Sequence, residues 1–157
     1  MLKRFMERKE DEDGFTLIEL MVVVLIIGIL IAIALPTFLG ARTRAQNRAA
    51  QSDLRNALVA AKTMYTDNSS YAAADSSATG LILVEPSLNY VAVAATGTNV
   101  SVAAISVSQW AAARLSASNT CLYISDSSTA GTKYGQTAPG TACAVPTMAL
   151  AAAASWT

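Results

Sequence analysis

Gly14-Phe15-Thr16-Leu17-Ile18-Glu19-Leu20 decides how this chain is built, because it places a carboxylate near the start of a long apolar run. The run continues from Phe15 to Leu35, about 21 residues, and as a helix it is long enough to span the hydrocarbon core of a bilayer. An ionised glutamate at that depth costs roughly 2.5–3.5 kcal/mol or more. We therefore expect Glu19 to meet an opposite charge inside the membrane.

The order of glycine, phenylalanine and glutamate at the head of an apolar helix resembles the type IV pilins and the related pseudopilins over residues 14–40. The resemblance implies that a membrane peptidase cuts between Gly14 and Phe15 and then methylates the new amino group of Phe15. It also implies that this amine pairs with Glu19 of a neighbouring subunit in a helical filament.

Residues 1–14 are then expected to be a leader peptide that is removed. The charged side chains of this segment cannot enter an apolar filament core without partners. They are Lys3, Arg4, Glu7, Arg8, Lys9, Glu10, Asp11, Glu12 and Asp13. Cleavage would remove them and leave an α-ammonium group on Phe15, near one helical turn from Glu19. The leader would therefore prevent assembly until it is cleaved.

Two simpler interpretations compete for this N-terminus. An ordinary secretory signal finds support in Ala32-Ile33-Ala34, which has the small-residue pattern of a cleavage site. Against it, the apolar run is long, contains Glu19 and follows an acidic segment. The second interpretation is an anchor that only tethers an extracytoplasmic binding module, but a lone anchor gains nothing from a membrane carboxylate.

The charge rule for membrane orientation does not decide the topology. Arg42, Arg44 and Arg48 follow the apolar run and rival the four basic residues that precede it. The resemblance implies that the N-terminus lies in the cytoplasm and the C-terminus outside.

The helix is expected to continue beyond the membrane segment, residues 15–36, into an amphipathic segment, residues 37–66. Pro36 removes a backbone donor, and with Gly40 it should kink or loosen the helix. By resemblance, this region unwinds when a filament stretches. One face of the second segment is apolar and is expected to pack on a sheet. It contains Leu54, Ala57, Leu58, Ala61 and Tyr65.

Four cations, Arg44, Arg48, Arg55 and Lys62, fall within about 40° of one another on the helical wheel. They indicate a solvated face, with Arg42 and Arg44 reaching lipid head groups before assembly. The more specific alternative is that these cations contact Asp53 or another acid of a neighbouring subunit. DNA binding is disfavoured, since the stripe has no stacking aromatic side chains beside it.

Residues 67–157 are expected to form a small globular β head. Turn-forming residues 67–70 close the helix, and strand-like runs follow at residues 81–84, 88–94, 99–107 and 121–124, with a bulge near Ala103-Ala104. Residues 148–156 would add an edge strand or a contact patch. A long N-terminal helix packed on a small antiparallel sheet is an α+β fold.

Cys121 and Cys143 are the only cysteines of the chain. In an extracytoplasmic head a disulfide is the natural interpretation, and this would resemble the disulfide-closed C-terminal loop of many pilins. Closing a loop of about 23 residues would stabilise the head by roughly 3 kcal/mol. Two free thiols or a metal pair are the alternatives.

An enzyme is not indicated. The 157 residues contain no histidine and carry a formal net charge of zero. Neither a phosphate-binding loop nor a dinucleotide turn is found, and no cofactor or metal ligand set is expected.

The sequence therefore predicts a structural subunit of a type IV pilus, made as a precursor, with a type II secretion pseudopilin as the close rival. The resemblance implies a precursor peptidase and methylase, an assembly platform and an ATPase as partners. It places the chain in the cytoplasmic membrane first and then in a surface filament, which serves adhesion, motility or DNA uptake in this family.

Overall fold

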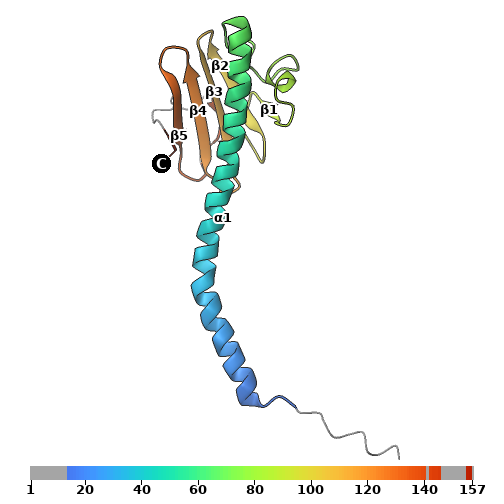
Figure 1. Ribbon diagram of the computed structural model, residues 1–157, viewed down its shortest axis with the longest axis vertical. Coiled ribbons are helices and arrows are strands. Elements are labelled where there is room, and N and C mark those ends of the chain that lie inside the picture. The colour runs from blue at the N-terminus through green and yellow to red at the C-terminus, as the bar shows by residue number, and fades with distance from the viewer. Residues whose placement is uncertain (1–13, 141, 146–154, 157) are drawn as a thin grey trace, which may run out of the picture. The chain divides into compact units, whose positions relative to one another are not determined.

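The computed structural model describes residues 14–140, 142–145 and 155–156 (Figure 1). Most of the expected leader and most of the tail at residues 148–156 therefore lie outside the described residues. The chain divides into two compact units, Met1–Gly40 and Ala41–Thr157. Each unit is considered by itself.

A single helix, α1 (Leu17–Asn68), supplies the described helical part of the first unit and the helical layer of the second. It begins two residues after Phe15 and ends next to Ser69, whose φ of 51° lies in the left-handed region that stops a helix. Pro36 lies inside α1, and the helix is assigned without a break through it. The expected loosening at Pro36 and Gly40 thus stays a prediction.

The second unit pairs the last part of α1 with a five-stranded sheet. The strands are β1 (Tyr90–Val91), β2 (Val100–Ser106), β3 (Gln109–Leu115), β4 (Cys121–Ser127) and β5 (Gly131–Gln136). Their spatial order follows the sequence, so the sheet is a meander. The pairs from β2 to β5 are antiparallel as expected, whereas the short β1 joins β2 in a parallel arrangement.

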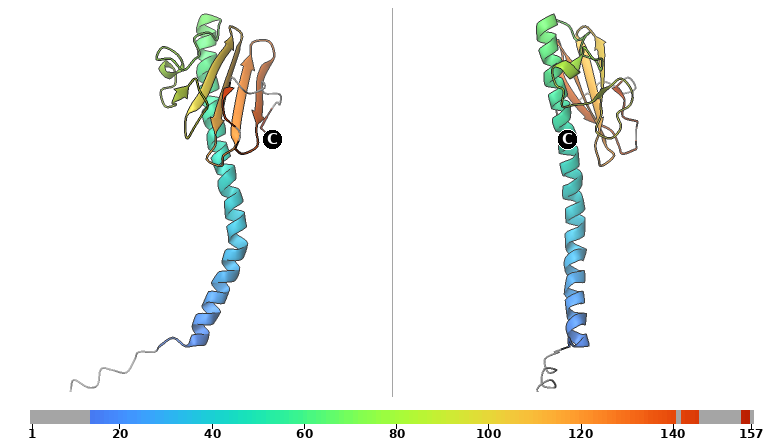
Figure 2. Two further views of the ribbon diagram at one scale, coloured as in Figure 1. Left: turned by 180° about the vertical axis from the view of Figure 1, so that it is seen from behind. Right: turned by 90° about the vertical axis from the view of Figure 1, so that its right-hand side faces the viewer.

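The core lies between one face of the sheet and α1 (Figure 2). Leu54, Ala57 and Ala61 of the expected apolar face are fully buried, while Tyr65 is only half-buried. Even-numbered side chains of the strands pack against them, in keeping with the two-residue period of a strand. They are Val100, Val102, Trp110, Ala112, Leu122 and Ile124.

The opposite face of the sheet carries a smaller core built mainly of odd-numbered residues. Ala111, Ala113 and Cys121 are buried there against Cys143 and Val145. The segment 142–145 is held in place by hydrogen bonds from Ala95 N–H to the Cys143 carbonyl (2.6 Å) and from Val145 N–H to the Ser101 hydroxyl (3.4 Å). Both faces of the sheet are thus covered at its centre.

Two of the expected strands need correction. Residues 81–84 form a 3₁₀ turn, η1 (Leu81–Leu83), because Leu83 N–H bonds the Gly80 carbonyl and Val84 N–H bonds the Leu81 carbonyl, both at 3.1 Å. Of residues 88–94, only Tyr90 and Val91 pair with a neighbouring strand. The strand expected at 99–107 is confirmed as β2, and its register shifts between Ala104 and Ser106. The strand expected at 121–124 is confirmed as the first part of β4.

Candidate functional site

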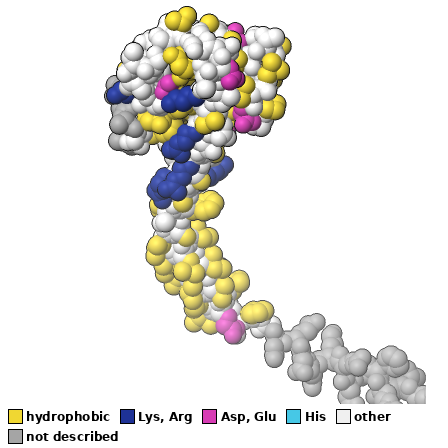
Figure 3. Space-filling model, turned by 45° about the horizontal axis from the view of Figure 1, so that its top comes forward, with side chains coloured by type: hydrophobic (Ala, Val, Ile, Leu, Met, Phe, Trp, Pro, Cys, Tyr) yellow, Lys and Arg dark blue, Asp and Glu magenta, His cyan; other side chains and the backbone are white. Residues whose placement is uncertain are grey.

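The apolar side chains of the first unit are presented to the surroundings rather than packed within the chain. Every large apolar side chain from Phe15 to Leu39 is at least 48% exposed. α1 is the one helix of the described residues that is long and apolar enough to cross a membrane. Figure 3 shows yellow side chains along the face of the helix that is in view. Such a surface requires lipid or other apolar helices around it.

Glu19 lies in the first turn of this helix and is bound by Thr16. Its carboxylate accepts hydrogen bonds from the Thr16 backbone N–H at 2.9 Å and from the Thr16 hydroxyl at 2.6 Å. In return, the Glu19 N–H donates to the Thr16 hydroxyl oxygen at 3.3 Å. This is a capping box, in which the N-cap and the third helical residue satisfy each other's backbone donors.

Thr16 is the site residue that the sequence reasoning missed, although the spacing Thr-x-x-Glu before an apolar run was a usable signal. Gly14 and Phe15 precede the helix and are exposed, so the peptide bond between them is not enclosed by the described structure. Gly14, Phe15 and Glu19 therefore lie on one short, accessible segment.

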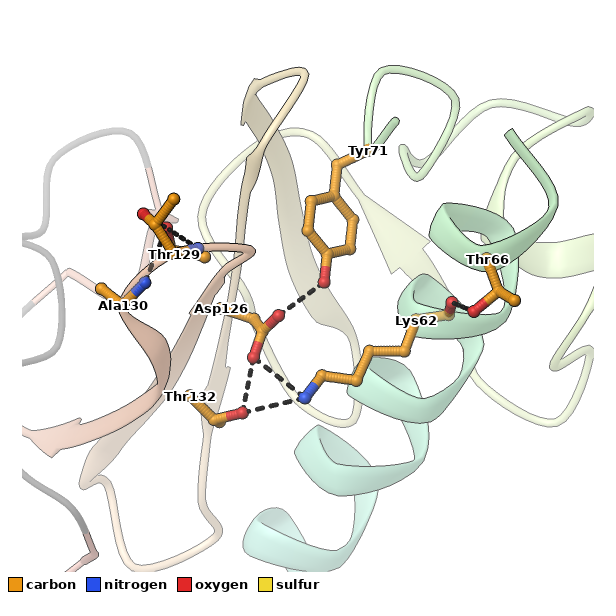
Figure 4. A network of polar contacts seen from close by, with 8 residues as sticks. Lys62, Thr66, Tyr71, Asp126, Thr129, Ala130 and Thr132 are labelled. Carbon is orange, nitrogen blue, oxygen red and sulfur yellow. Dashed lines mark hydrogen bonds and ion pairs between the residues drawn. The ribbon is translucent and has the colours of Figure 1, made fainter. Parts of the chain in front are cut away.

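A polar network joins α1 to the edge of the sheet in the second unit (Figure 4). The Lys62 ammonium lies 3.1 Å from the Asp126 carboxylate and donates to the Thr132 hydroxyl at 3.1 Å. Asp126 also accepts hydrogen bonds from the Tyr71 and Thr132 hydroxyls, each at 2.5 Å. Residues from α1, the loop after it, β4 and β5 thus converge on one buried carboxylate.

The pKa of Asp126 is set by two opposing effects. Burial raises it, but hydrogen bonds from Thr132, Tyr71 and Lys62, together with the Lys62 charge, outweigh burial and hold the pKa below its usual value. Burial and the neighbouring Asp126 raise the pKa of Tyr71, so its hydroxyl remains a donor. The network is therefore fully formed near neutral pH.

Replacing Asp126 with Asn should lower the free energy of unfolding at pH 7 by about 1–3 kcal/mol, since the Lys62 and Tyr71 donors lose a charged acceptor. Because the folded-state pKa is depressed, this stabilisation is present above the unfolded pKa near 3.9 and is lost as the pH falls through the folded value. Urea titrations of the full chain in detergent should show a constant difference between pH 7 and about 5 and a shrinking one below about 4. Asp67→Asn, which changes an exposed acid at the end of α1, is the matched control.

A second ion pair joins α1 to β3. Arg114 is buried and pairs with Asp53. Its guanidinium also donates to the Ala49 carbonyl at 3.5 Å. Asp53 is therefore engaged within its own chain, which weakens the expectation that it meets a cation of a neighbouring subunit.

The cation stripe on α1 divides into two halves. Lys62 is bound to Asp126, and the Arg55 guanidinium lies 5.2 Å from the centre of the Trp156 ring. Arg44 and Arg48 are exposed. Arg55 and Lys62 thus stabilise the head. Only Arg44 and Arg48 have the solvated character expected from the sequence.

The disulfide between Cys121 and Cys143 is present, with the two Cα atoms 5.4 Å apart. It joins the start of β4 to the segment that covers the outer face of the sheet. The expectation of a disulfide-closed C-terminal loop is therefore confirmed.

Together these features define an α+β protein with an exposed apolar N-terminal helix and a small disulfide-closed head, the architecture of pilin-like proteins. Residues 11–35 match the family described as the prokaryotic N-terminal methylation motif. No solved structure matches the chain.

Three relatives show how far the similarity extends. The type IV major pilin protein PilA of Myxococcus xanthus is 45% identical over 58 residues, which are 37% of this chain and 26% of the relative. The type II secretion system core protein G of Vibrio cholerae is 40% identical over 78 residues, 49% of this chain and 53% of the relative. The fimbrial protein EcpC of Eikenella corrodens is 40% identical over 93 residues, 58% of this chain and 60% of the relative.

The chain thus matches less than two thirds of the length of each of these relatives. The methylation motif and these relatives nevertheless support the resemblance of this chain to type IV pilins and pseudopilins.

Proposed function

We propose that the chain is the precursor of a structural subunit of a type IV pilus. The observation that carries this proposal is the exposed apolar helix headed by Glu19. Its aliphatic surface needs an apolar environment, and a filament of parallel apolar helices supplies one after the bilayer is left behind. The relatives named as pilus proteins support the same function.

Processing is the first step of the proposed function. A membrane peptidase cuts the exposed bond between Gly14 and Phe15, and the new amino group of Phe15 is methylated. The cut removes the charged leader, whose transfer into an apolar core would be very costly. The chain lies in the cytoplasmic membrane at this stage, with its N-terminus on the cytoplasmic side and its head outside.

Assembly follows from the charge that processing creates. The Phe15 ammonium of an incoming subunit pairs with Glu19 of its neighbour, and both charges lose water together. The capping bonds from Thr16 hold the Glu19 carboxylate at the N-terminal end of the helix, where an incoming ammonium can reach it. An assembly platform and an ATPase move the subunit into the filament, and the segment around Pro36 and Gly40 gives the filament its extensibility.

Fibres on the cell surface provide the test of this function. An antibody against the head should decorate long surface fibres, and deletion of the coding sequence should remove the label. Label restricted to the periplasm would contradict the pilus and favour the second candidate, a pseudopilin of a type II secretion system. That candidate is supported by the relatives named type II secretion system core protein G, at 40–42% identity.

A further inference from the structure

Three arginines lie on α1 just after the apolar run, where the helix reaches the head. Arg42, Arg44 and Arg48 are all exposed, and no acidic residue occurs from Ala41 to Ser52. Figure 3 shows dark-blue side chains on both sides of the helix where it leaves the head. Residues 41–52 of α1 therefore carry a high density of positive charge.

The described part of the head does not neutralise these arginines. The nearest acid on the same helix, Asp53, pairs with Arg114, and Asp126 pairs with Lys62. Within the described residues, no ion pair or hydrogen bond is found at the guanidinium groups of Arg42, Arg44 and Arg48. These guanidinium groups are therefore open to an external anion.

The directions in which the arginines point limit what that partner can be. At 100° per residue, Arg44 and Arg48 lie about 40° apart, but Arg42 lies about 160° from Arg44 on the other side of the helix. One flat protein surface cannot contact both sides of a helix. A layer of lipid head groups that surrounds the helix can contact all three.

The position of the three arginines along α1 agrees with a layer of lipid head groups. Asn47 of α1 already contacts the head, since its side-chain oxygen accepts a hydrogen bond from the Ser118 hydroxyl at 2.6 Å. The interval from Arg42 to Arg48 rises about 9 Å in a helix. The polar head-group layer of one leaflet is roughly 5–8 Å thick, so this interval is long enough to cross it.

We propose that Arg42, Arg44 and Arg48 form an arginine collar that binds the phosphates of anionic phospholipids in the outer leaflet before the subunit is assembled. This inference rests on the membrane stage of the proposed function. The collar sets the depth of the helix and keeps the head at the membrane surface. It also explains a cluster of basic residues on the outer side of the membrane, where the usual charge bias does not favour them.

The test measures lipid selectivity at the protein. The full chain is reconstituted in phosphatidylcholine vesicles that carry a trace of spin-labelled phosphatidylglycerol or spin-labelled phosphatidylcholine. Electron paramagnetic resonance then gives the ratio of the two lipids' association constants at the protein surface. We expect phosphatidylglycerol to be preferred by at least about fivefold at low salt, because a single basic residue near a charged surface already contributes about that factor. The preference should fall toward one in 1 M salt.

Three variants separate the collar from general positive charge. Arg42→Gln/Arg44→Gln/Arg48→Gln should bring the ratio close to one, and Arg44→Gln alone should lower it. Arg55→Gln removes one charge from the same stripe, but this residue lies against Trp156 in the head and should keep the wild-type ratio. Equal losses in Arg44→Gln and Arg55→Gln would overturn the collar.

Other outcomes distinguish the collar from the function on which it rests. If carbonate extraction released the chain from the vesicles, the membrane stage and the collar would both fail. A retained chain with no preference for phosphatidylglycerol would overturn the collar alone. An unchanged lipid ratio in the triple variant, together with fewer cross-linked oligomers, would assign the arginines to a neighbouring subunit instead.

Discussion

Glu19→Gln is expected to leave cleavage after Gly14 intact and to lower the amount of assembled filament by at least about a hundredfold. Removing one partner of a buried ion pair costs about 3–5 kcal/mol, because the other charge stays buried without compensation. The glutamine side chain can still serve in the capping box with Thr16. The variant therefore removes the charge and keeps the local helix start. The measurement is the ratio of sheared to cell-associated protein.

Asp67→Asn is the control for this variant, since it removes an exposed carboxylate from the far end of α1. It should assemble normally. Normal assembly of Glu19→Gln would show that charge pairing with Phe15 is not what Glu19 does. If Glu19→Ala failed to assemble while Glu19→Gln succeeded, the capping box would be its role.

Cys121→Ser/Cys143→Ser is expected to lower the free energy of unfolding by about 3 kcal/mol, because the disulfide closes a loop between residues 22 apart in sequence. For a head of this size, the loss corresponds to a fall of roughly 12–24 °C in Tm. The disulfide also holds the segment that covers Ala111 and Ala113, so its loss should loosen that face of the sheet first.

Thermal unfolding followed by circular dichroism measures this effect on the full chain in detergent. Wild-type protein in excess dithiothreitol serves as the second measurement and should unfold at the temperature of the double variant. A change in Tm of less than about 4 °C in both cases would contradict a stabilising role for the disulfide.

Parts of the fold could be predicted because their signals are local or chemical. The apolar run and Glu19 predicted the N-terminal helix, and the strand-like run at residues 99–107 predicted β2. The cysteine pair indicated the disulfide. In each case, the residues that carry the signal are close in sequence or belong to a rare type.

Two strands were missed because their residues do not favour strands in isolation. The alanines of β3, Ala111–Ala113, have a low strand preference, but small side chains suit a sheet that is covered on both faces. In β5, Gly131 and Gly135 indicate turns. Gly135 is needed there because the Tyr123 ring of the neighbouring strand occupies the space of its side chain.

The apolar run at Leu81 was mistaken for a strand because a short run fits either structure. Its backbone instead begins a 3₁₀ turn, and Leu81 N–H donates a hydrogen bond to the Asp75 carbonyl at 3.1 Å. The network around Asp126 carried no local signal, since Lys62 and Thr132 are 70 residues apart and Tyr71 and Asp126 are 55 apart. Only the tertiary structure brings these residues together.

The most direct test of the proposed function is the intact mass and N-terminal residue of the chain recovered from sheared cell-surface material. We predict a chain that begins at N-methylated Phe15 and is lighter by two hydrogens for the disulfide. A chain that begins at Leu35 would mean an ordinary secretory signal and a released head. A chain that keeps Met1 and stays in the membrane would contradict the filament subunit and leave only a tether.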